Sequence, residues 1–130
     1  FNPGVGAQYS ASNYVLLSLV IEKATGMRLG DYFRENLFVP YGLKHTYYLA
    51  DSFYIPHFAK SYSAEENIIQ PFILPLEYRL LMGAGAVASN LSDFVRWHSM
   101  MMKGYMVSAS SLAFLTSPCV LNNGKISLRM

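Results

Sequence analysis

A nearly continuous apolar run between residues 14 and 21 constrains this chain more than any other feature. Apart from Ser18, every position in it is aliphatic or aromatic: Tyr14, Val15, Leu16, Leu17, Leu19, Val20 and Ile21. Such a run predicts a helix with no face left for water. We therefore expect this helix to be buried in the core of the protein.

The residues on either side of the run indicate where the helix begins and ends. Ser10, Ser12 or Asn13 is in place to cap its start, and Gly26 to end it in the left-handed conformation. Tyr9 then stands immediately before the first turn. A tyrosine fixed at the mouth of a helix is well placed for chemistry.

The composition indicates one domain that carries more apolar surface than usual. The 130 residues suit a single domain with a sizeable core, which we assign to residues 1–130. Hydrophobic residues make up 52% and charged residues 14% of the chain, against about 45–50% and about 25% in ordinary globular proteins. We expect the excess apolar surface to be covered by a partner or by more of the same polypeptide.

Charge, hydropathy and metal-ligand spacing exclude several classes of function. The net charge of +2 is scattered, so we expect no nucleic-acid partner. No run approaches the roughly 18 apolar residues of a transmembrane segment, and no signal peptide starts at Phe1. The three histidines (His45, His57 and His98) lie too far apart to predict a metal site, and Cys119 is expected to be a buried, unreactive thiol. No cofactor is expected either, since residues 83–88 lack a nucleotide fingerprint and indicate close backbone packing instead.

The rest of the chain predicts mainly helices. Residues 27–38 form a second helix, ended by Pro40, and residues 45–49 a short strand. Residues 50–75 are expected to be a long irregular connection, packed through its aromatic side chains and serving as the wall of a site.

The second half continues this pattern. A short strand at residues 86–88 precedes a helix at residues 91–102, which Asn90 caps. Its apolar residues, with His98 either in the core or on the surface, are expected to face inward: Phe94, Val95, Trp97 and Met101. A further helix follows at residues 108–116, and a tight turn at residues 122–124 precedes the start of a strand at residue 126.

Four segments in order resemble one known family. Residues 1–17 read F-x-P-G-x-x-x-x-Y-S-x-x-N-Y-x-L-L and continue as I-E-K-A-T-G at residues 21–26. Residues 32–46, 85–94 and 111–118 match later motifs in the same order. Together they resemble the serine β-lactamase-related family, which includes class C β-lactamases, D,D-peptidases and esterases. The resemblance implies an α+β fold of the serine β-lactamase/transpeptidase type, with this chain mainly its helical part plus a few short strands.

The resemblance also implies a mechanism. Tyr9 matches the family's catalytic tyrosine. In such enzymes the serine of an S-x-x-K motif attacks a small-molecule amide, ester or β-lactam, and an acyl-enzyme forms and is hydrolysed. The tyrosine and the lysine relay the proton, because a neutral phenol needs cationic neighbours to act as a base. An extracytoplasmic location, periplasmic or secreted, is the family's usual address.

Three departures from the family pattern qualify this expectation. None of the five lysines has a serine three residues before it, and no K-T-G or H-x-G motif is present. Ala11 occupies the substrate-binding position where the family has Asn. We therefore expect an internal piece that is inert by itself and needs the remainder of its polypeptide. Two alternatives stay open: a non-catalytic binding or regulatory relative, and an unrelated helical domain in which Tyr9 would be fully buried.

Overall fold

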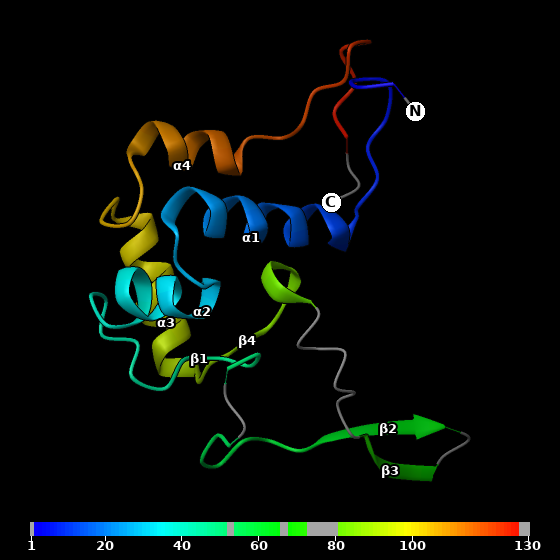
Figure 1. Ribbon diagram of the computed structural model, residues 1–130. Helices are drawn as coiled ribbons and strands as arrows, with labels where there is room; N and C mark the ends of the chain where they lie inside the picture. The colour runs from blue at the N-terminus through cyan, green and yellow to red at the C-terminus, as the bar shows by residue number, and fades with distance from the viewer. Residues whose placement is uncertain (1, 52–53, 66–67, 73–80, 128–130) are drawn as a thin grey trace.

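The computed structural model describes residues 2–51, 54–65, 68–72 and 81–127. Helices dominate it, with two small antiparallel pairs of strands (Figure 1). In chain order the elements are α1 (Ala11–Thr25), α2 (Leu29–Phe33), the π-helical turn η1 (Arg34–Phe38), β1 (Tyr47–Tyr48), β2 (Ser61–Glu65), β3 (Ile68–Phe72), the 3₁₀ turn η3 (Met82–Ala84), β4 (Val87–Ala88), α3 (Leu91–Met102) and α4 (Ala109–Thr116).

The first helix begins and ends where the sequence predicts. Ser10 occupies the N-cap position of α1, although its side chain makes no capping hydrogen bond. At the other end Gly26 adopts φ 69°, and its N–H donates to the Glu22 carbonyl at 2.8 Å. A left-handed residue at this point satisfies a carbonyl that the helix itself leaves free.

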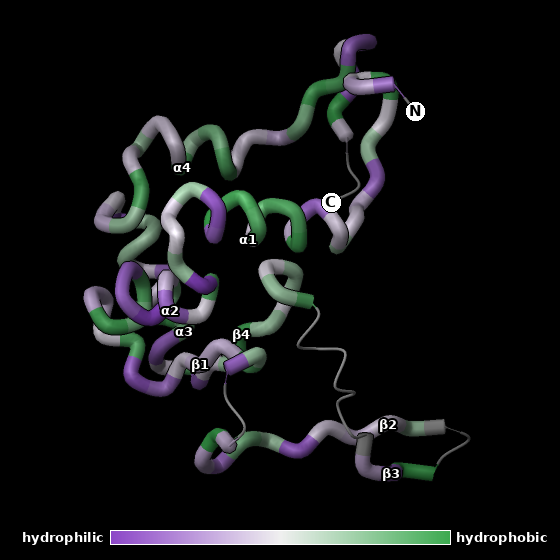
Figure 2. The backbone as a smooth tube through the Cα atoms, viewed as in Figure 1, coloured by the Kyte–Doolittle hydropathy of each residue, from purple (hydrophilic) through white to green (hydrophobic). Residues whose placement is uncertain are grey.

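The expectation that α1 is buried on all sides is wrong for the described structure. Leu16, Leu17 and Val20 are 60%, 56% and 61% exposed, whereas Ser18 is only 1% exposed. Figure 2 shows this helix as a largely hydrophobic tube. The cause is that α2 and η3 contact α1 along the side that carries Ser18. Within the described residues, Leu16, Leu17 and Val20 lie away from these contacts and stay exposed.

The buried core lies where α2 meets the paired strands β1 and β4. Leu29, Tyr48 and Ala86 are 1%, 7% and 0% exposed, and they come from α2, β1 and the residue before β4. Strands β1 and β4 pair in antiparallel register, with Tyr47 opposite Ala88 and Tyr48 opposite Val87. The Phe33 ring meets the Tyr48 ring edge-on, with centroids 5.7 Å apart. This small core therefore joins Leu29 of α2 to residues 19 and 57 positions later in the chain.

The second predicted helix is present as α2 followed directly by η1, so residues 29–38 are continuously helical. The chain then turns at Gly42, whose φ is 66°. Leu43, which follows this turn, is buried, with an exposed fraction of 5%.

The connection after residue 50 is more regular than predicted. Strands β2 and β3 form an antiparallel hairpin, in which Tyr62 lies opposite Pro71 and Ala64 opposite Ile69. In Figure 1 the hairpin projects away from the helices, and Ile69 is 75% exposed, so the expected packing is not seen here. A two-stranded ribbon has no central strand, which is why Pro71 is tolerated in it. Residues 52–53, 66–67 and 73–80 of this connection lie outside the described residues.

The predicted cap of α3 is confirmed, because the Asn90 side-chain oxygen accepts from the Asp93 N–H at 2.8 Å. The predicted inward face is partly wrong. Phe94 and Val95 are 55% and 57% exposed and His98 is also exposed, whereas Asp93 is 6% exposed. Asp93 is turned inward because its carboxylate accepts hydrogen bonds from the segment just before β1, as described below.

The C-terminal part returns to the start of the chain. The Asn122 N–H donates to the Gly4 carbonyl at 2.8 Å, and Figure 1 shows the segment before α1 beside the segment that follows α4. The predicted turn is confirmed by a hydrogen bond from the Gly124 N–H to the Leu121 carbonyl at 2.9 Å. Cys119 is exposed, so its expected burial is wrong. Within the described ranges, no helix is both long and apolar enough to cross a bilayer.

Candidate active site

Tyr9 lies directly before the N-cap residue of α1, and its side chain is 61% exposed. The chain reaches it in an extended conformation, since Ser10 has φ −145° and ψ 119°. The Tyr14 ring lies beside the Tyr9 ring, with centroids 6.1 Å apart and planes inclined by 36°. Tyr9 is thus held at the open end of a helix, where another molecule or chain segment can reach it.

Ala11 is the first residue of α1 and is half-buried. Its methyl group offers no hydrogen bond, so Ala11 cannot supply the side-chain amide that the resemblance leads us to expect at this position. Asn13, two positions later, is exposed, and its backbone N–H donates to the Ser10 carbonyl at 3.2 Å. On a helix these two positions point in different directions, because residues two apart do not share a face. Asn13 therefore does not replace an amide at position 11.

The turn η3 packs closely against the first half of α1. A Cβ atom added at Gly83 would lie 2.6 Å from the Tyr14 carbonyl oxygen and 3.2 Å from the Ser18 Cβ. Only glycine permits so close an approach of two backbones. The close backbone packing predicted for the small residues after Met82 is confirmed, and it falls on the helical turns that follow Tyr9.

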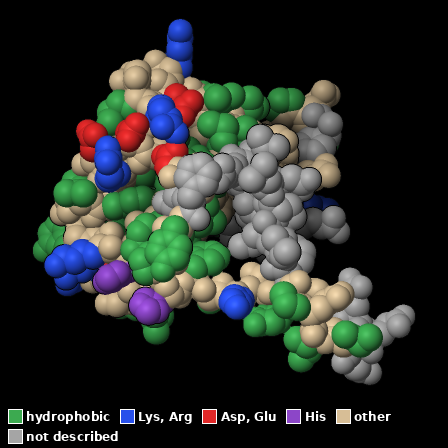
Figure 3. All heavy atoms as spheres, turned by 60° about the horizontal axis from the view of Figure 1, so that its bottom comes forward, with side chains coloured by type: hydrophobic (Ala, Val, Ile, Leu, Met, Phe, Trp, Pro, Cys, Tyr) green, Lys and Arg blue, Asp and Glu red, His purple; other side chains and the backbone are tan. Residues whose placement is uncertain are grey.

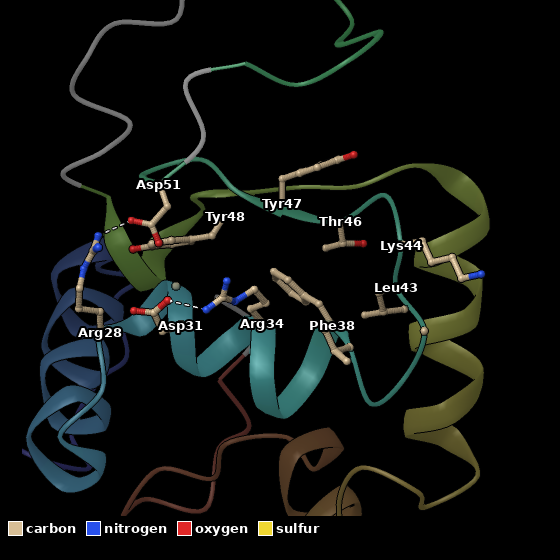
Figure 4. Close-up of a pocket in the computed structure, with 13 residues that line it drawn as sticks. Arg28, Asp31, Arg34, Phe38, Leu43, Lys44, Thr46, Tyr47, Tyr48 and Asp51 are labelled. Atoms are coloured by element: carbon tan, nitrogen blue, oxygen red, sulfur yellow. Dashed lines mark hydrogen bonds and ion pairs between the residues drawn. The ribbon is translucent and has the colours of Figure 1, made fainter.

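A cavity of 630 Å³ lies elsewhere, between η1 and β1 (Figure 4). Four of its charged side chains are already paired with each other. Arg28 bonds the Asp51 carboxylate, and Arg34 bonds Asp31 at 3.1 Å. Lys44 points away from these pairs in Figure 4. In Figure 3, acidic and basic side chains also gather together in one area of the face shown. Mutual neutralisation indicates a structural role for these charges rather than a ligand site.

Tyr48 forms part of the wall of this cavity and of the core. Burial raises the pKa of its phenol, and the negative charges of Asp51 and Glu22 add to the rise, while Arg28 opposes it. Nearby, a side chain at Gly30 would overlap the Asp51 carboxylate and come within 2.7 Å of the Tyr48 ring. The tyrosine with the shifted pKa is therefore a packed, neutral core residue.

Asp93 connects α3 to the segment before β1. Its Oδ2 accepts from the His45 N–H at 2.6 Å and from the Thr46 hydroxyl at 3.0 Å. Thr46 is also 2.8 Å from the Ser89 hydroxyl. Beside these groups lies an apolar cavity of 410 Å³, to which Phe94 and Trp97 contribute. The sequence predicted the cap at Asn90 but not these contacts of the Asp93 carboxylate.

Neither Tyr9 nor Ala11 lines these two cavities or a third one of 520 Å³, in whose wall His45 and His57 lie. Among the described residues, no three His, Cys, Asp or Glu side chains come together in a way that could hold a metal ion. The candidate site is therefore an open surface at the head of α1.

Comparison with known proteins shows to which family the chain belongs. The sequence model of a family described as Beta-lactamase matches residues 1–125. The chain belongs to the Beta-lactamase family. An unrelated helical domain is thereby excluded, in agreement with the exposed position of Tyr9.

The individual relatives share this assignment. Penicillin-binding protein 4* of Bacillus subtilis is 31% identical over 96% of the chain, and an unguisins hydrolase of Aspergillus campestris is 30% identical over 78%. A crystal structure of a D-stereospecific amidohydrolase from Streptomyces superposes with a TM-score of 0.80 at 24% identity over 94% of the chain. The fold is thus the α+β fold of serine β-lactamases and transpeptidases, represented here mainly by helices.

The chain spans only part of each of these proteins. It covers 30% of the Bacillus protein, 20% of the Aspergillus protein and 36% of the Streptomyces chain. Most of the length of these proteins thus has no counterpart in the 130 residues.

Tyr14 is the residue near this site that the sequence reasoning missed. It was read only as one of the apolar residues of the helix. Its spacing from Tyr9 was a usable signal, since residues directly before the N-cap often pack against the fourth helical residue.

Proposed function

We propose that this chain is part of a serine hydrolase that acts on an amide, ester or β-lactam through an acyl-serine intermediate. Membership of the Beta-lactamase family over residues 1–125 supports this proposal. The observation that carries it is the exposure of Tyr9, 61%, at the head of a helix whose neighbouring residues match the family's tyrosine motif.

In the proposed reaction Tyr9 acts as the proton relay. The hydroxyl oxygen of a serine attacks the substrate carbonyl, and its proton passes to a base formed by the phenol and a neighbouring lysine. The same groups return a proton to the leaving amine or alcohol, and water then hydrolyses the acyl-serine. The 130 residues contain no S-x-x-K motif, so the serine and the lysine would come from further polypeptide.

The 130 residues then form one part of a larger domain. The exposed apolar side of α1 supports this proposal, since exposed patches of that kind mark surfaces that normally contact something else. The connection between residues 50 and 82 would form a wall of the substrate cleft. Its described hairpin has free edges and exposed apolar side chains with which to do so.

A second candidate is a non-catalytic relative that binds or regulates. Ala11 favours it, because the missing amide would otherwise bond the substrate and the catalytic lysine. Replacing Ala11 by Asn separates the two candidates. A gain of hydrolysis in Ala11→Asn indicates an enzyme that lacks one polar arm, whereas no hydrolysis in either form indicates a binding protein.

Active-site labelling tests the main proposal. We expect the full-length polypeptide to be labelled by a fluorophosphonate or penicillin probe and Tyr9→Phe to lose most of that labelling, by about 10²–10⁴-fold in rate. Tyr105→Phe is the matched control, because Tyr105 is exposed to a similar degree, 65%, on another segment. Equal labelling of Tyr9→Phe and wild type would contradict the proposal, as would hydrolysis by the isolated 130 residues.

A further inference from the structure

The start of α1 lacks the usual device that fixes a helix entry. Ser10 stands at the N-cap, but its hydroxyl accepts no hydrogen bond from the first turn, and that turn carries no acidic residue. A single backbone contact, from the Asn13 N–H to the Ser10 carbonyl at 3.2 Å, closes the turn. Because Tyr9 precedes this N-cap, side-chain capping does not determine its direction.

A pair of aromatic rings takes the place of the cap. Tyr9 is the residue before the N-cap and Tyr14 is the fourth helical residue, which are the two positions of a hydrophobic staple. Their ring centroids are 6.1 Å apart with planes at 36°, within the range of attractive aromatic pairs. Such a contact fixes the angle at which the chain enters the helix.

The backbone of Tyr14 also packs against the turn η3. The backbone of Gly83 lies against its carbonyl oxygen, so closely that no side chain would fit at position 83. One turn later, Ser18 is 1% exposed beneath the same glycine and donates its hydroxyl to the Val15 carbonyl at 2.6 Å. The backbone that carries the Tyr14 ring is therefore tied to η3.

We propose that Tyr14 is the positioning residue for Tyr9: its ring, anchored through Gly83, holds the Tyr9 phenol in the direction that proton relay requires. This inference rests on the proposed function of Tyr9. Tyr9 is 61% exposed, and among the described residues the aromatic ring packed beside it is that of Tyr14. A misplaced relay group lowers the rate of acylation without changing any group that reacts.

The test uses the full-length polypeptide and three variants. We expect Tyr14→Ala to lower the rate of fluorophosphonate acylation by about 10- to 100-fold, since a 1 Å misplacement can cost about 10². Tyr14→Phe keeps the ring and is expected to acylate like wild type, because within the described residues the Tyr14 hydroxyl has no hydrogen-bond partner. Tyr105→Ala removes a ring that is 65% exposed on another segment, so it is the control for general loss of an exposed aromatic side chain.

A spectroscopic measurement separates the positioning role from the chemistry. In wild type and in Tyr9→Phe we expect nuclear Overhauser contacts between rings 9 and 14, which Tyr14→Ala abolishes. Wild-type acylation by Tyr14→Ala would overturn the inference alone, as would absence of the contact between the rings. Undiminished acylation by Tyr9→Phe would instead overturn the proposed function, whatever the ring contact shows.

Discussion

The two sides of α1 face different surroundings, although both are built from similar residues. On one side α2 and η3 cover the helix, and Leu29 and Ala86 beyond them are almost completely buried. On the other side Leu16, Leu17 and Val20 are more than half exposed. Composition along α1 does not explain this difference, since the buried residue at the contact is Ser18. What packs against each side decides which residues count as core.

This contrast separates scaffold from site. The covered side holds its groups by tight contacts, such as the Gly83 backbone on the Tyr14 carbonyl. The open side carries the exposed apolar side chains Leu16, Leu17 and Val20, and Tyr9 stands at the open end of the same helix. The variants below test whether the two sides also differ in their contribution to the free energy of unfolding.

The largest expected effect concerns Leu29 at the centre of the covered side. Leu29→Ala is expected to lower the free energy of unfolding by about 2–5 kcal/mol, because it removes buried methyl groups and leaves a cavity. Leu17→Ala, the same truncation on the open side, is expected to change it by less than about 0.5 kcal/mol. Urea denaturation followed by circular dichroism measures both. Equal losses would mean that the open side is already covered, for instance by self-association.

A smaller effect is expected at Asp93. Asp93→Ala removes the acceptor for the His45 N–H and the Thr46 hydroxyl and should cost about 1–3 kcal/mol of unfolding free energy. Asp93→Asn retains a side-chain oxygen and should cost less. Hydrogen exchange of the His45 amide, compared with amides elsewhere in the chain, provides a local readout, since the His45 N–H donates to Asp93. An unchanged exchange rate in Asp93→Ala would show that this contact contributes nothing.

The smallest effect is a dependence of stability on pH through Tyr48. Its pKa is raised in the folded protein above the ordinary value of 10.0, chiefly by burial. The neutral phenol is therefore favoured by folding, and this contribution is fully present below pH 10 and is lost as the pH rises through the folded-state pKa. Tyr48→Phe keeps the ring and should flatten the alkaline part of the stability curve. Identical alkaline curves for the two proteins would contradict the raised pKa.

Local signals in the sequence predicted much of the fold. Gly26 ends α1 through its left-handed backbone, and Asn90 caps α3 through its side chain. Both features depend on neighbours within four residues, so a short stretch of sequence contains the information. The same holds for the turn that ends at Gly124.

Burial could not be predicted in this way. The sequence suggests that Phe94 and Val95 face inward, yet it cannot state which side of α3 meets another element. The β2–β3 hairpin was missed because Pro71 argues against a strand. At the candidate site, Tyr9 was found through its motif. Its contact with Tyr14 also follows from spacing, but the brace at Gly83 joins residues almost 70 positions apart.

The hydrogen bonds that tie Asn122 to Gly4 and Pro3 have a topological consequence. They close residues 3–122 into a loop whose first and last segments are bonded to each other, across a separation of 119 positions for Pro3 and Asn122. The segment that leads into α1 is therefore held by the segment that follows α4 (Figure 1). A substitution at Asn122 would thus release the residues that precede Tyr9, although it lies far from Tyr9 in the sequence.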